Sequence, residues 1–255
     1  MSDQRHKAER FRELHIPGKP FVLFNVWDAG SAKAVTASGA SAIATGSWSV
    51  AHAYGFGDGE RLPLAIAIDN LRRIVGATDL PVTIDLESGY GYSAEHVGDT
   101  IGLAIEAGAV GCNLEDSFPA DGTLRATVDQ VARIRRARQA AETAKISFFI
   151  NARTDVFFQG PADQHDEARV AEAVERARAC ADAGADGLFA PGLNNPGLIA
   201  HLAEASPLPL NIMVDDATPP LQALAGHGVA RVSHGPRPYL LAMKALEQAA
   251  RTALA

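Results

Sequence analysis

The chain has 255 residues, of which 47% are hydrophobic and 21% are charged, and its formal net charge is −7. This is ordinary globular composition, and the acidic balance argues against nucleic acid or an anionic membrane as the main partner. Its two cysteines, Cys112 and Cys180, form no CxxC pair, which argues against a disulfide framework or a zinc ribbon. The charged N-terminus lacks an apolar signal core and no apolar run approaches about 20 residues, so we expect a cytoplasmic protein.

Short apolar runs that end in polar residues or glycine recur along the chain. In chain order, the expected strands are 21–27, 41–47, 81–87, 110–116, 147–153, 187–191, 210–214 and 229–233. They are rich in Val, Ile and Phe and lack a clean polar alternation. Parallel strands that are buried on both faces have this pattern.

Segments with helical periodicity alternate with these runs. The expected helices are 31–37, 65–75, 95–107, 128–140, 166–183, 195–205, 219–225 and 238–255. Several end in a glycine turn, which is a good helix-stop signal. Eight βα units without a break in composition predict one parallel (β/α)₈ TIM-type barrel over residues 1–255. We expect a helical extension at about 1–18, outside or beneath the barrel; an open doubly wound sheet is the alternative.

Acidic side chains gather at the expected carboxyl ends of two neighbouring strands. Asp85 and Glu87 stand two apart on an extended segment, so their side chains are expected to point to the same side, and Glu115 ends the next strand. Three crowded carboxylates repel one another unless a cation neutralises them. An oxygen-only set favours Mg²⁺ or Mn²⁺ over zinc. Taken singly, each acid could instead cap a helix or pair with an arginine.

Other polar residues are expected at the same mouth. Arg153 ends the fifth strand, and its forked guanidinium suits a carboxylate or phosphate, unless it pairs with Asp155 or Glu115. The segment Thr45-Gly46-Ser47 could cradle a carboxylate. A glycine-rich stretch at 53–59 carries Asp58 and is expected to be a mobile loop, although plain turn chemistry explains its glycines equally well.

Three further residues complete the expected site. Trp27 lies at the end of the first expected strand and Asn211 lies on the seventh, and both are expected to contact the substrate. His234 is the one histidine expected near the mouth. The histidines show no HxH or HxxxH spacing. The sequence also contains no GxGxxG or GxxxxGK[ST] phosphate loop and no GxSxG elbow.

From about residue 18 to residue 236 the sequence resembles the isocitrate lyase/phosphoenolpyruvate mutase superfamily. The similar motifs are NVWDAGSA (25–32), Thr45-Gly46-Ser47, DLESGYG (85–91), LED (114–116), NARTD (151–155) and GVARVSHGP (228–236). Their order along the chain makes the resemblance specific.

The resemblance implies Mg²⁺ held by Asp85, with Asp58, Glu87 and Glu115 contacting it directly or through water. It implies a 2-oxo acid or its enolate bound by the segment 45–47 and by Arg153. It also implies dimers or tetramers in which the last helix is swapped between subunits. A proton donor is left open among Asp58, Tyr90, His234 and water.

One departure limits the expected chemistry. The carbon–carbon lyases of the family carry a Lys-x-Cys-Gly-His segment after LED, and the mutases carry Lys and Asn there, whereas this chain reads SFPADGTLR at 117–125. We therefore expect a Mg²⁺-dependent lyase or decarboxylase that acts on a small 2-oxo or 2-hydroxy di-acid through a stabilised enolate. The alternatives are a phosphonopyruvate or phosphoenolpyruvate mutase or hydrolase, and a non-catalytic protein that binds 2-oxo acids.

Overall fold

The computed structural model describes residues 2–255; Met1, part of the expected N-terminal extension, lies outside them. Eight parallel strands form one sheet in the order β1-β8-β7-β6-β5-β4-β3-β2. They are β1 (Phe21–Leu23), β2 (Ile43–Ala44), β3 (Val82–Asp85), β4 (Gly111–Glu115), β5 (Phe149–Arg153), β6 (Gly187–Phe189), β7 (Leu210–Met213) and β8 (Arg231–Ser233). An isolated parallel bridge between Val26 and Thr45 joins the two ends of the sheet. The predicted (β/α)₈ barrel is confirmed, and the open sheet is excluded.

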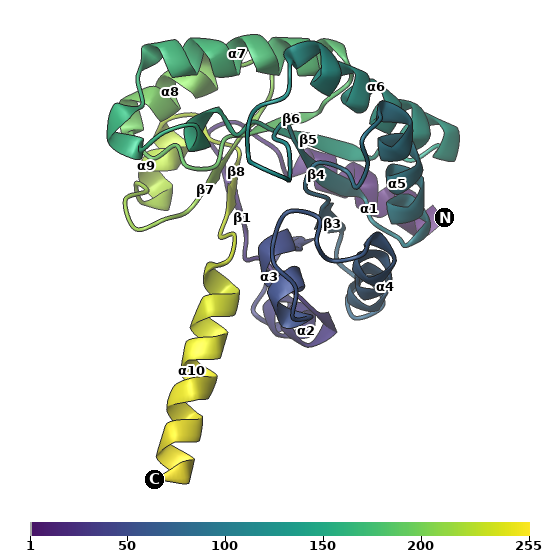
Figure 1. Cartoon of the computed structure of the whole chain (residues 1–255), viewed down its shortest axis with the longest axis vertical. Helices are drawn as coiled ribbons and strands as arrows, with labels where there is room; N and C mark the ends of the chain where they lie inside the picture. The colour runs from purple at the N-terminus through teal and green to yellow at the C-terminus, as the bar shows by residue number, and fades with distance from the viewer. Residues whose placement is uncertain (1) are drawn as a thin grey trace.

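Helices alternate with the strands around the barrel (Figure 1). They are α1 (Ser2–Glu13), α2 (Ala29–Ala37), α3 (Ser47–Ala53), α4 (Leu64–Val75), α5 (Ala94–Glu106), α6 (Thr127–Ala144), α7 (Glu167–Asp182), α8 (Pro196–Ala205), α9 (Leu221–Gly226) and α10 (Arg237–Leu254), with short 3₁₀ helices at Val156–Phe158 and Ala162–Gln164. Helix α3 was not predicted. Its buried Val50 and Ala51 pack against Leu62 and Ala67, which gives this short helix a small core of its own at the barrel mouth.

Helix α1 closes the end of the barrel opposite the mouth. Phe11 is fully buried there, and its ring lies edge-to-face with Phe149 of β5 at 5.6 Å between centroids. Gln4 fixes the other end of the helix by donating to the carbonyls of Ile105 and Ala109. Burial of a phenylalanine contributes about 1.5–3 kcal/mol, so α1 seals the floor of the barrel with apolar contacts.

A layer of polar side chains crosses the interior of the barrel above this floor. In β4 and β5 Asn113 stands opposite Asn151, and in β7 and β8 Asn211 stands opposite Arg231. Asn151 Nδ2 donates to Asn113 Oδ1 at 2.9 Å and to Asn211 Oδ1 at 3.2 Å. Arg231 Nη2 donates to Asn113 Oδ1 at 3.0 Å. Side chains fill the interior of barrels of this type, and this polar set lies directly beneath the mouth.

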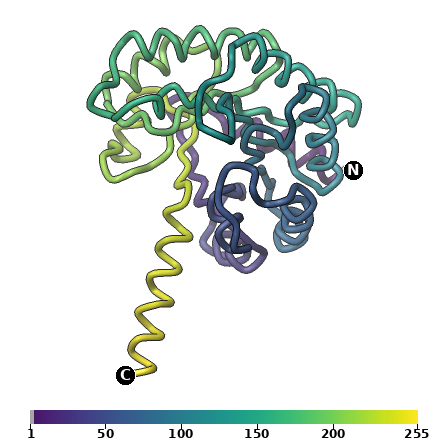
Figure 2. The backbone as a smooth tube through the Cα atoms, in the orientation of Figure 1, coloured from purple at the N-terminus to yellow at the C-terminus, as the bar shows by residue number. Residues whose placement is uncertain are grey.

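Helix α10 leaves the barrel and projects away from it, as both backbone views show (Figures 1 and 2). Its buried residue is Pro238, and the chain is exposed from Met243 to its end. The exposed residues include Leu241 and Leu246, the latter 63% exposed. Among the described residues, no helix combines the length and the apolar character needed to cross a membrane.

His15 lies at the C-terminal end of α1 among aromatic rings. Its ring stacks on Phe149 at 3.8 Å, and its Nδ1 lies 2.9 Å from the carbonyl oxygen of Phe11. Nε2 is buried without a hydrogen-bond partner. Burial, with a smaller contribution from Arg231, lowers the pKa of His15 to about 3. The folded protein therefore holds this histidine neutral, with Nδ1 as the donor.

We expect His15 to make stability fall as the pH drops below about 6.5. The unfolded chain binds a proton near its ordinary pKa while the folded chain does not, so the unfolded state gains up to about 1.4 kcal/mol per pH unit, or about 2 kcal/mol at pH 5. In His15→Phe, the free energy of unfolding, measured by denaturant titration between pH 7.5 and 5, should lose this slope relative to the wild type. Equal slopes in the two proteins would contradict a neutral buried His15.

Candidate active site

A cavity of about 190 Å³ opens at the carboxyl ends of the strands. The polar residues that line it are Asn25, Ser47, Asp58, Asp85, Asn113, Arg153 and Ser233. The apolar ones are Trp48, Phe158, Phe189, Pro191, Met213 and Pro236, and Gly46 and Gly235 complete the lining. The volume corresponds to about six water molecules at about 30 Å³ each. The cavity is therefore suited to a small polar ligand, at the position where barrels of this type place their sites.

Asp85 ends β3 at the floor of this cavity. Its Oδ2 accepts from the backbone N–H of Ser47 at 3.2 Å and from the Ser47 hydroxyl at 3.0 Å. Its Oδ1 is buried and has no hydrogen-bond partner. The backbone N–H of Asp85 donates to Thr45 Oγ1, which fixes the strand end in place. Among the described residues, Asp85 Oδ1 is the one buried carboxylate oxygen that lacks a partner.

Glu87 does not continue the extended segment that the sequence suggested. The strand ends at Asp85, and Glu87 adopts the left-handed conformation with φ of 51°. Its Oε2 accepts from the backbone N–H groups of Gly59 and Glu60 at 2.8 and 2.6 Å. Burial is the main cause that raises the pKa of Glu87 to about 7, and the negative charge of Asp58 is the next largest. Glu87 therefore anchors the loop that carries Asp58.

Backbone strain is concentrated in this pair of loops. Glu60, Glu87 and Tyr90 all have positive φ although none is a glycine. Glu60 Oε1 accepts from the Ser88 hydroxyl and from the Tyr90 N–H, so the two loops hold each other reciprocally. Such conformations cost about 1–3 kcal/mol each and persist where surrounding contacts enforce them, commonly at functional sites.

Arg153 is held between two acids rather than standing free. Its Nη1 lies 2.8 Å from Glu115 Oε2, and its Nε and Nη2 donate to the two carboxylate oxygens of Asp155 at 2.7 and 3.1 Å. Although burial alone would lower it, Glu115 and Asp155 raise the pKa of Arg153 well above its ordinary value. A guanidinium has five N–H groups, so N–H groups remain for a ligand in the cavity.

The three acids Asp85, Glu87 and Glu115 therefore do not converge on one point. Over residues 2–255 the structure contains no group of three or more His, Cys, Asp or Glu side chains placed to bind one ion. Glu87 is turned toward a loop and Glu115 toward Arg153. The acids still influence one another, since Asp85, after burial, is the largest factor that raises the pKa of Asp58.

The donor set at Asp85 nevertheless fits a divalent cation. An unpartnered buried carboxylate oxygen is what a cation would satisfy, and Mg²⁺ commonly takes one or two carboxylates and completes its shell with water and substrate. Asp85 Oδ1 would be the direct ligand, with Asp58 and other acids acting through water. Oxygen ligands without His or Cys suit Mg²⁺ or Mn²⁺ rather than zinc.

Several residues expected at the site lie outside the cavity wall. Thr45 is buried and supports β3, and Asn211 lies within the polar layer of the barrel. Trp27 packs edge-on against Tyr239. The Tyr90 hydroxyl lies 3.4 Å from Glu87 Oε1, and burial, with Glu87, raises the pKa of that hydroxyl. The ring of His234 lies against Phe24.

Sequence reasoning missed other residues that do line the cavity. Asn25 has a clear structural role: its Oδ1 accepts from the N–H groups of His234 and Gly235, and its Nδ2 donates to the carbonyl of Thr45. It thereby joins the ends of β1, β2 and β8. Asn113 was hidden inside an expected strand, and Trp48 lies on the helix that was not predicted. The inward register of the strands could have indicated Asn113.

The loop after β4 forms a closed hairpin in place of the missing lyase segment. Ser117 and Leu124 form an antiparallel bridge, and the guanidinium of Arg125 lies 4.1 Å from the centre of the Phe118 ring. The Ser117 hydroxyl donates to Asp155 Oδ2 at 2.6 Å. This loop therefore supports the acids around Arg153 and brings no lysine to the cavity wall.

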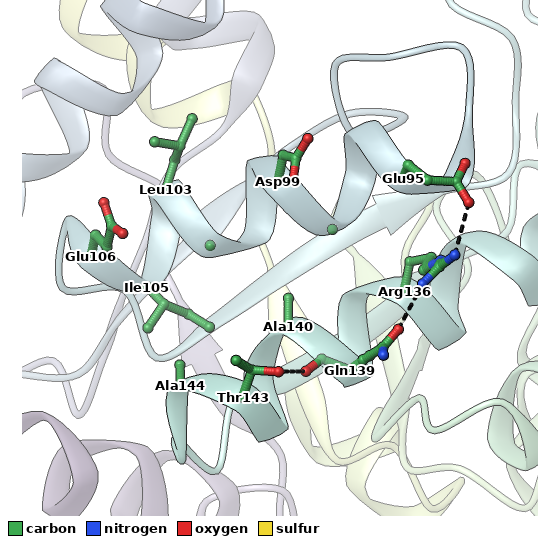
Figure 3. A pocket seen from close by; sticks show the side chains of 12 residues that line it. Glu95, Asp99, Leu103, Ile105, Glu106, Arg136, Gln139, Ala140, Thr143 and Ala144 are labelled. Atoms are coloured by element: carbon green, nitrogen blue, oxygen red, sulfur yellow. Dashed lines mark hydrogen bonds and ion pairs between the residues drawn. The ribbon is translucent and has the colours of Figure 1, made fainter.

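A second cavity, of about 760 Å³, lies on the outside of the barrel between α5 and α6 (Figure 3). Glu95 and Arg136 form an ion pair at its edge, and Arg136 also donates to Gln139. The groove is open and its charged groups are exposed, so it lacks the buried, unpartnered groups that distinguish the mouth. We therefore assign the candidate active site to the mouth.

The family model for phosphoenolpyruvate phosphomutase matches residues 11–254. The chain belongs to the phosphoenolpyruvate mutase family. Within this family it is 34% identical over 242 residues to a protein of Mycobacterium tuberculosis whose function is uncharacterized, covering 94% of this chain and 87% of that one. It is 30% identical to the 2-methylisocitrate lyase of Escherichia coli over 226 residues, covering 81% and 73%.

Further similarities span the same family. The oxaloacetate decarboxylase of Pseudomonas savastanoi pv. phaseolicola is 29% identical over 245 residues, covering 92% of this chain and 80% of that one. A provisionally named phosphonomutase of Burkholderia cenocepacia J2315 superposes with a TM-score of 0.96 at 56% identity, covering 98% and 99%. A phosphonopyruvate hydrolase solved with oxalate and Mg²⁺ has a TM-score of 0.82 at 24% identity, covering 95% and 84%, and shows the shared fold alone. The chain is an enzyme of the isocitrate lyase/phosphoenolpyruvate mutase superfamily.

The anchoring role of Glu87 can be tested by amide hydrogen exchange. Glu87→Ala removes the acceptor of two N–H groups, and we expect protection at Gly59 and Glu60 to fall by about 1–3 kcal/mol in opening free energy. Glu87→Gln keeps one oxygen that can accept from both groups, so it should retain most of the protection. Wild-type protection in Glu87→Ala would show that other contacts hold this loop.

Proposed function

We propose that the chain is a Mg²⁺-dependent lyase or decarboxylase that acts on a small 2-oxo di-acid through an enolate. The observation that carries this proposal is Asp85 Oδ1, a buried and unpartnered carboxylate oxygen at the floor of a small polar cavity. The named relatives, a 2-methylisocitrate lyase and an oxaloacetate decarboxylase, give the proposal its substrate class. The choice of ion rests on the oxygen donor at Asp85, which without His or Cys favours Mg²⁺.

A bound Mg²⁺ would supply Lewis-acid stabilisation of the negative charge that develops on the 2-oxo group. The residues of the chain have separate roles around it. Arg153 has N–H groups left to donate to a substrate carboxylate, and its two acidic partners hold the guanidinium in a fixed orientation. Ser47, on the same wall, orients Asp85 through two hydrogen bonds. Apolar side chains also line the cavity and limit its hydration.

Asp58 is the residue we propose as the proton donor to the enolate. Of the candidates left open by the sequence, it is the one whose side chain lines the cavity. Tyr90 is directed toward Glu87, and the ring of His234 packs on Phe24. Loss of the proton donor should reduce kcat more than it raises KM.

A phosphonate substrate is the second candidate, because the similar structure from Burkholderia cenocepacia carries a phosphonomutase name. The cavity wall has one cationic side chain, Arg153, which is already paired with two acids, and it has no lysine. Turnover of phosphonopyruvate followed by phosphorus NMR distinguishes this candidate. Binding of 2-oxo acids with Mg²⁺ and no turnover of any of them would instead indicate a non-catalytic binding protein.

Substitution of Asp85 and Arg153 tests the proposed chemistry. In a screen of 2-oxo di-acids for pyruvate or a related product, Asp85→Ala should lose metal-dependent activity by at least about 100-fold in kcat/KM. Arg153→Ala should lose about 10- to 100-fold, since it removes a charged donor. Chelation of metal by EDTA should abolish turnover, and added Mg²⁺ should restore it.

Arg136→Ala is the matched control, because this arginine forms an exposed ion pair with Glu95 on the outside of the barrel. It should change activity by less than about twofold. Unchanged turnover in Asp85→Ala would remove the proposal.

We also propose that the protein is a homo-oligomer, a dimer or tetramer, in which α10 packs on a second copy. Helix α10 exposes Leu240, Leu241 and Leu246, and an uncovered apolar groove of about 600 Å³ lies between β1 and α2, lined by Phe21, Phe24 and Val35 among others. A helix that follows β8 is expected to cover this side of a barrel, whereas α10 projects away from it (Figure 2). A second copy of α10 could fill the groove.

Light scattering after size-exclusion chromatography tests this assembly. Leu246→Asp places a charge on the apolar face of α10, and we expect its molar mass to fall toward the 26.8 kDa of one chain. Gln248→Asp adds the same charge two residues away and should keep the wild-type mass. A monomeric wild-type protein would contradict the proposal.

A further inference from the structure

Asn113 presents its amide at the floor of the cavity and is only 6% exposed. Its Oδ1 accepts two hydrogen bonds from beneath, from Asn151 Nδ2 at 2.9 Å and from Arg231 Nη2 at 3.0 Å. Both hydrogen-bonding directions of this oxygen are therefore occupied within the barrel. Its Nδ2 makes no hydrogen bond to any of the residues that the structure describes, and it is not sealed from solvent.

The orientation of this amide follows from the chemistry of Arg231. A guanidinium donates and never accepts, so the atom of Asn113 that faces Arg231 must be the oxygen. Arg231 is 1% exposed, and burial lowers its pKa to about 9, which leaves it protonated at neutral pH. The NH₂ group of Asn113 must consequently face the cavity.

Neighbouring asparagines oppose a flip of this amide. Asn151 Nδ2 donates both to Asn113 and to Asn211 Oδ1. Asn211 Nδ2 in turn lies 3.0 Å from the carbonyl oxygen of Ile212 and 3.3 Å from that of Arg231, which fixes its own orientation. Turning Asn113 over would place its NH₂ against two donors, so the hydrogen bonds from Asn151 and Arg231 to Asn113 would both be lost in a buried layer.

We propose that Asn113 is a substrate-binding residue whose Nδ2 donates to an oxygen of the bound 2-oxo acid, and that Arg231 is the positioning residue that aims it. This inference rests on the proposed function, since it assumes an anionic acid in the mouth cavity. The polar layer then has a specific role. The buried Arg231 does not line the cavity, but its hydrogen bond to Asn113 directs the neutral NH₂ group of that residue toward the ligand.

Oxalate is a suitable probe, because it carries the paired oxygens of a 2-oxo acid or its enolate and undergoes no turnover. Isothermal titration of the full-length protein with oxalate in the presence of Mg²⁺ gives the affinity. Asn113→Ala should weaken oxalate binding about 10-fold or more, because it removes a donor to a charged ligand. Asn195→Ser, an exposed amide outside the cavity, should bind as the wild type does.

Asn113→Asp separates a ligand role from a structural role. It keeps an acceptor for Asn151 and Arg231 but replaces the donor NH₂ with a second oxygen, so folding should be retained while oxalate binding weakens at least as much as in Asn113→Ala. Weakening in Asn113→Asp alone would be an effect of the added charge and would overturn the proposal. Wild-type affinity in Asn113→Ala would overturn it equally.

A double-mutant cycle tests the positioning role of Arg231. Arg231→Met alone should weaken oxalate binding, whereas in the Asn113→Ala background it should cause no further loss of affinity. Additive losses would overturn the coupling, and if Arg231→Met fails to fold, the Asn113 pair still decides the ligand role. A wild-type protein that binds no oxalate with Mg²⁺ would overturn the proposed function itself, a result distinct from equal binding by wild type and Asn113→Ala.

Discussion

Carboxylates buried at the mouth of a barrel must each be stabilised by some partner, because an isolated buried charge is strongly unfavourable. Here each acid is stabilised differently. Glu115 pairs with Arg153, Glu87 accepts two backbone N–H groups, and Asp85 receives both hydrogen bonds on a single oxygen from Ser47. The second oxygen of Asp85 is left without a partner. The candidate metal ligand follows from this asymmetry.

The conformation of the loops at the mouth also reflects the need of buried carboxylates for hydrogen-bond partners. Glu87 can accept from Gly59 and Glu60 only because its backbone turns into the left-handed region after the strand. In the opposite direction, the Glu60 carboxylate accepts from the Ser88 hydroxyl and from the backbone N–H of Tyr90. Two strained segments thus stabilise each other. As a result, the loop that carries Asp58 has a fixed position. Strain at these positions and order at the mouth are two aspects of one arrangement.

The sequence predicted the barrel because apolar runs and helical periods depend on local pattern, which eight repeats reinforce. It predicted Asp85 and Arg153 in the cavity for the same reason, since both end strands. The expected convergence of Glu87 with Asp85 assumed that extended backbone continues past residue 85, and local pattern does not encode that turn. Asn211 lies on β7 as predicted and Thr45 directly follows β2, but hydrogen bonds to other strands direct their side chains into the scaffold. Helix α3 and Trp48 depend on tertiary packing against α4, which no short window of sequence reveals.

Arg231 influences groups at both the closed and the open end of the barrel. Below it lies the aromatic floor around Phe11 and His15, where burial and then the Arg231 cation lower the pKa of His15. Above it, Arg231 donates a single hydrogen bond to Asn113, and Asn113 lines the cavity. An apolar residue at position 231 would fill the same space, but it would leave the hydrogen bond from Asn151 as the remaining constraint on the amide of Asn113. A buried arginine is costly to stability, and the orientation that it imposes on Asn113 at the cavity floor gives this cost a function.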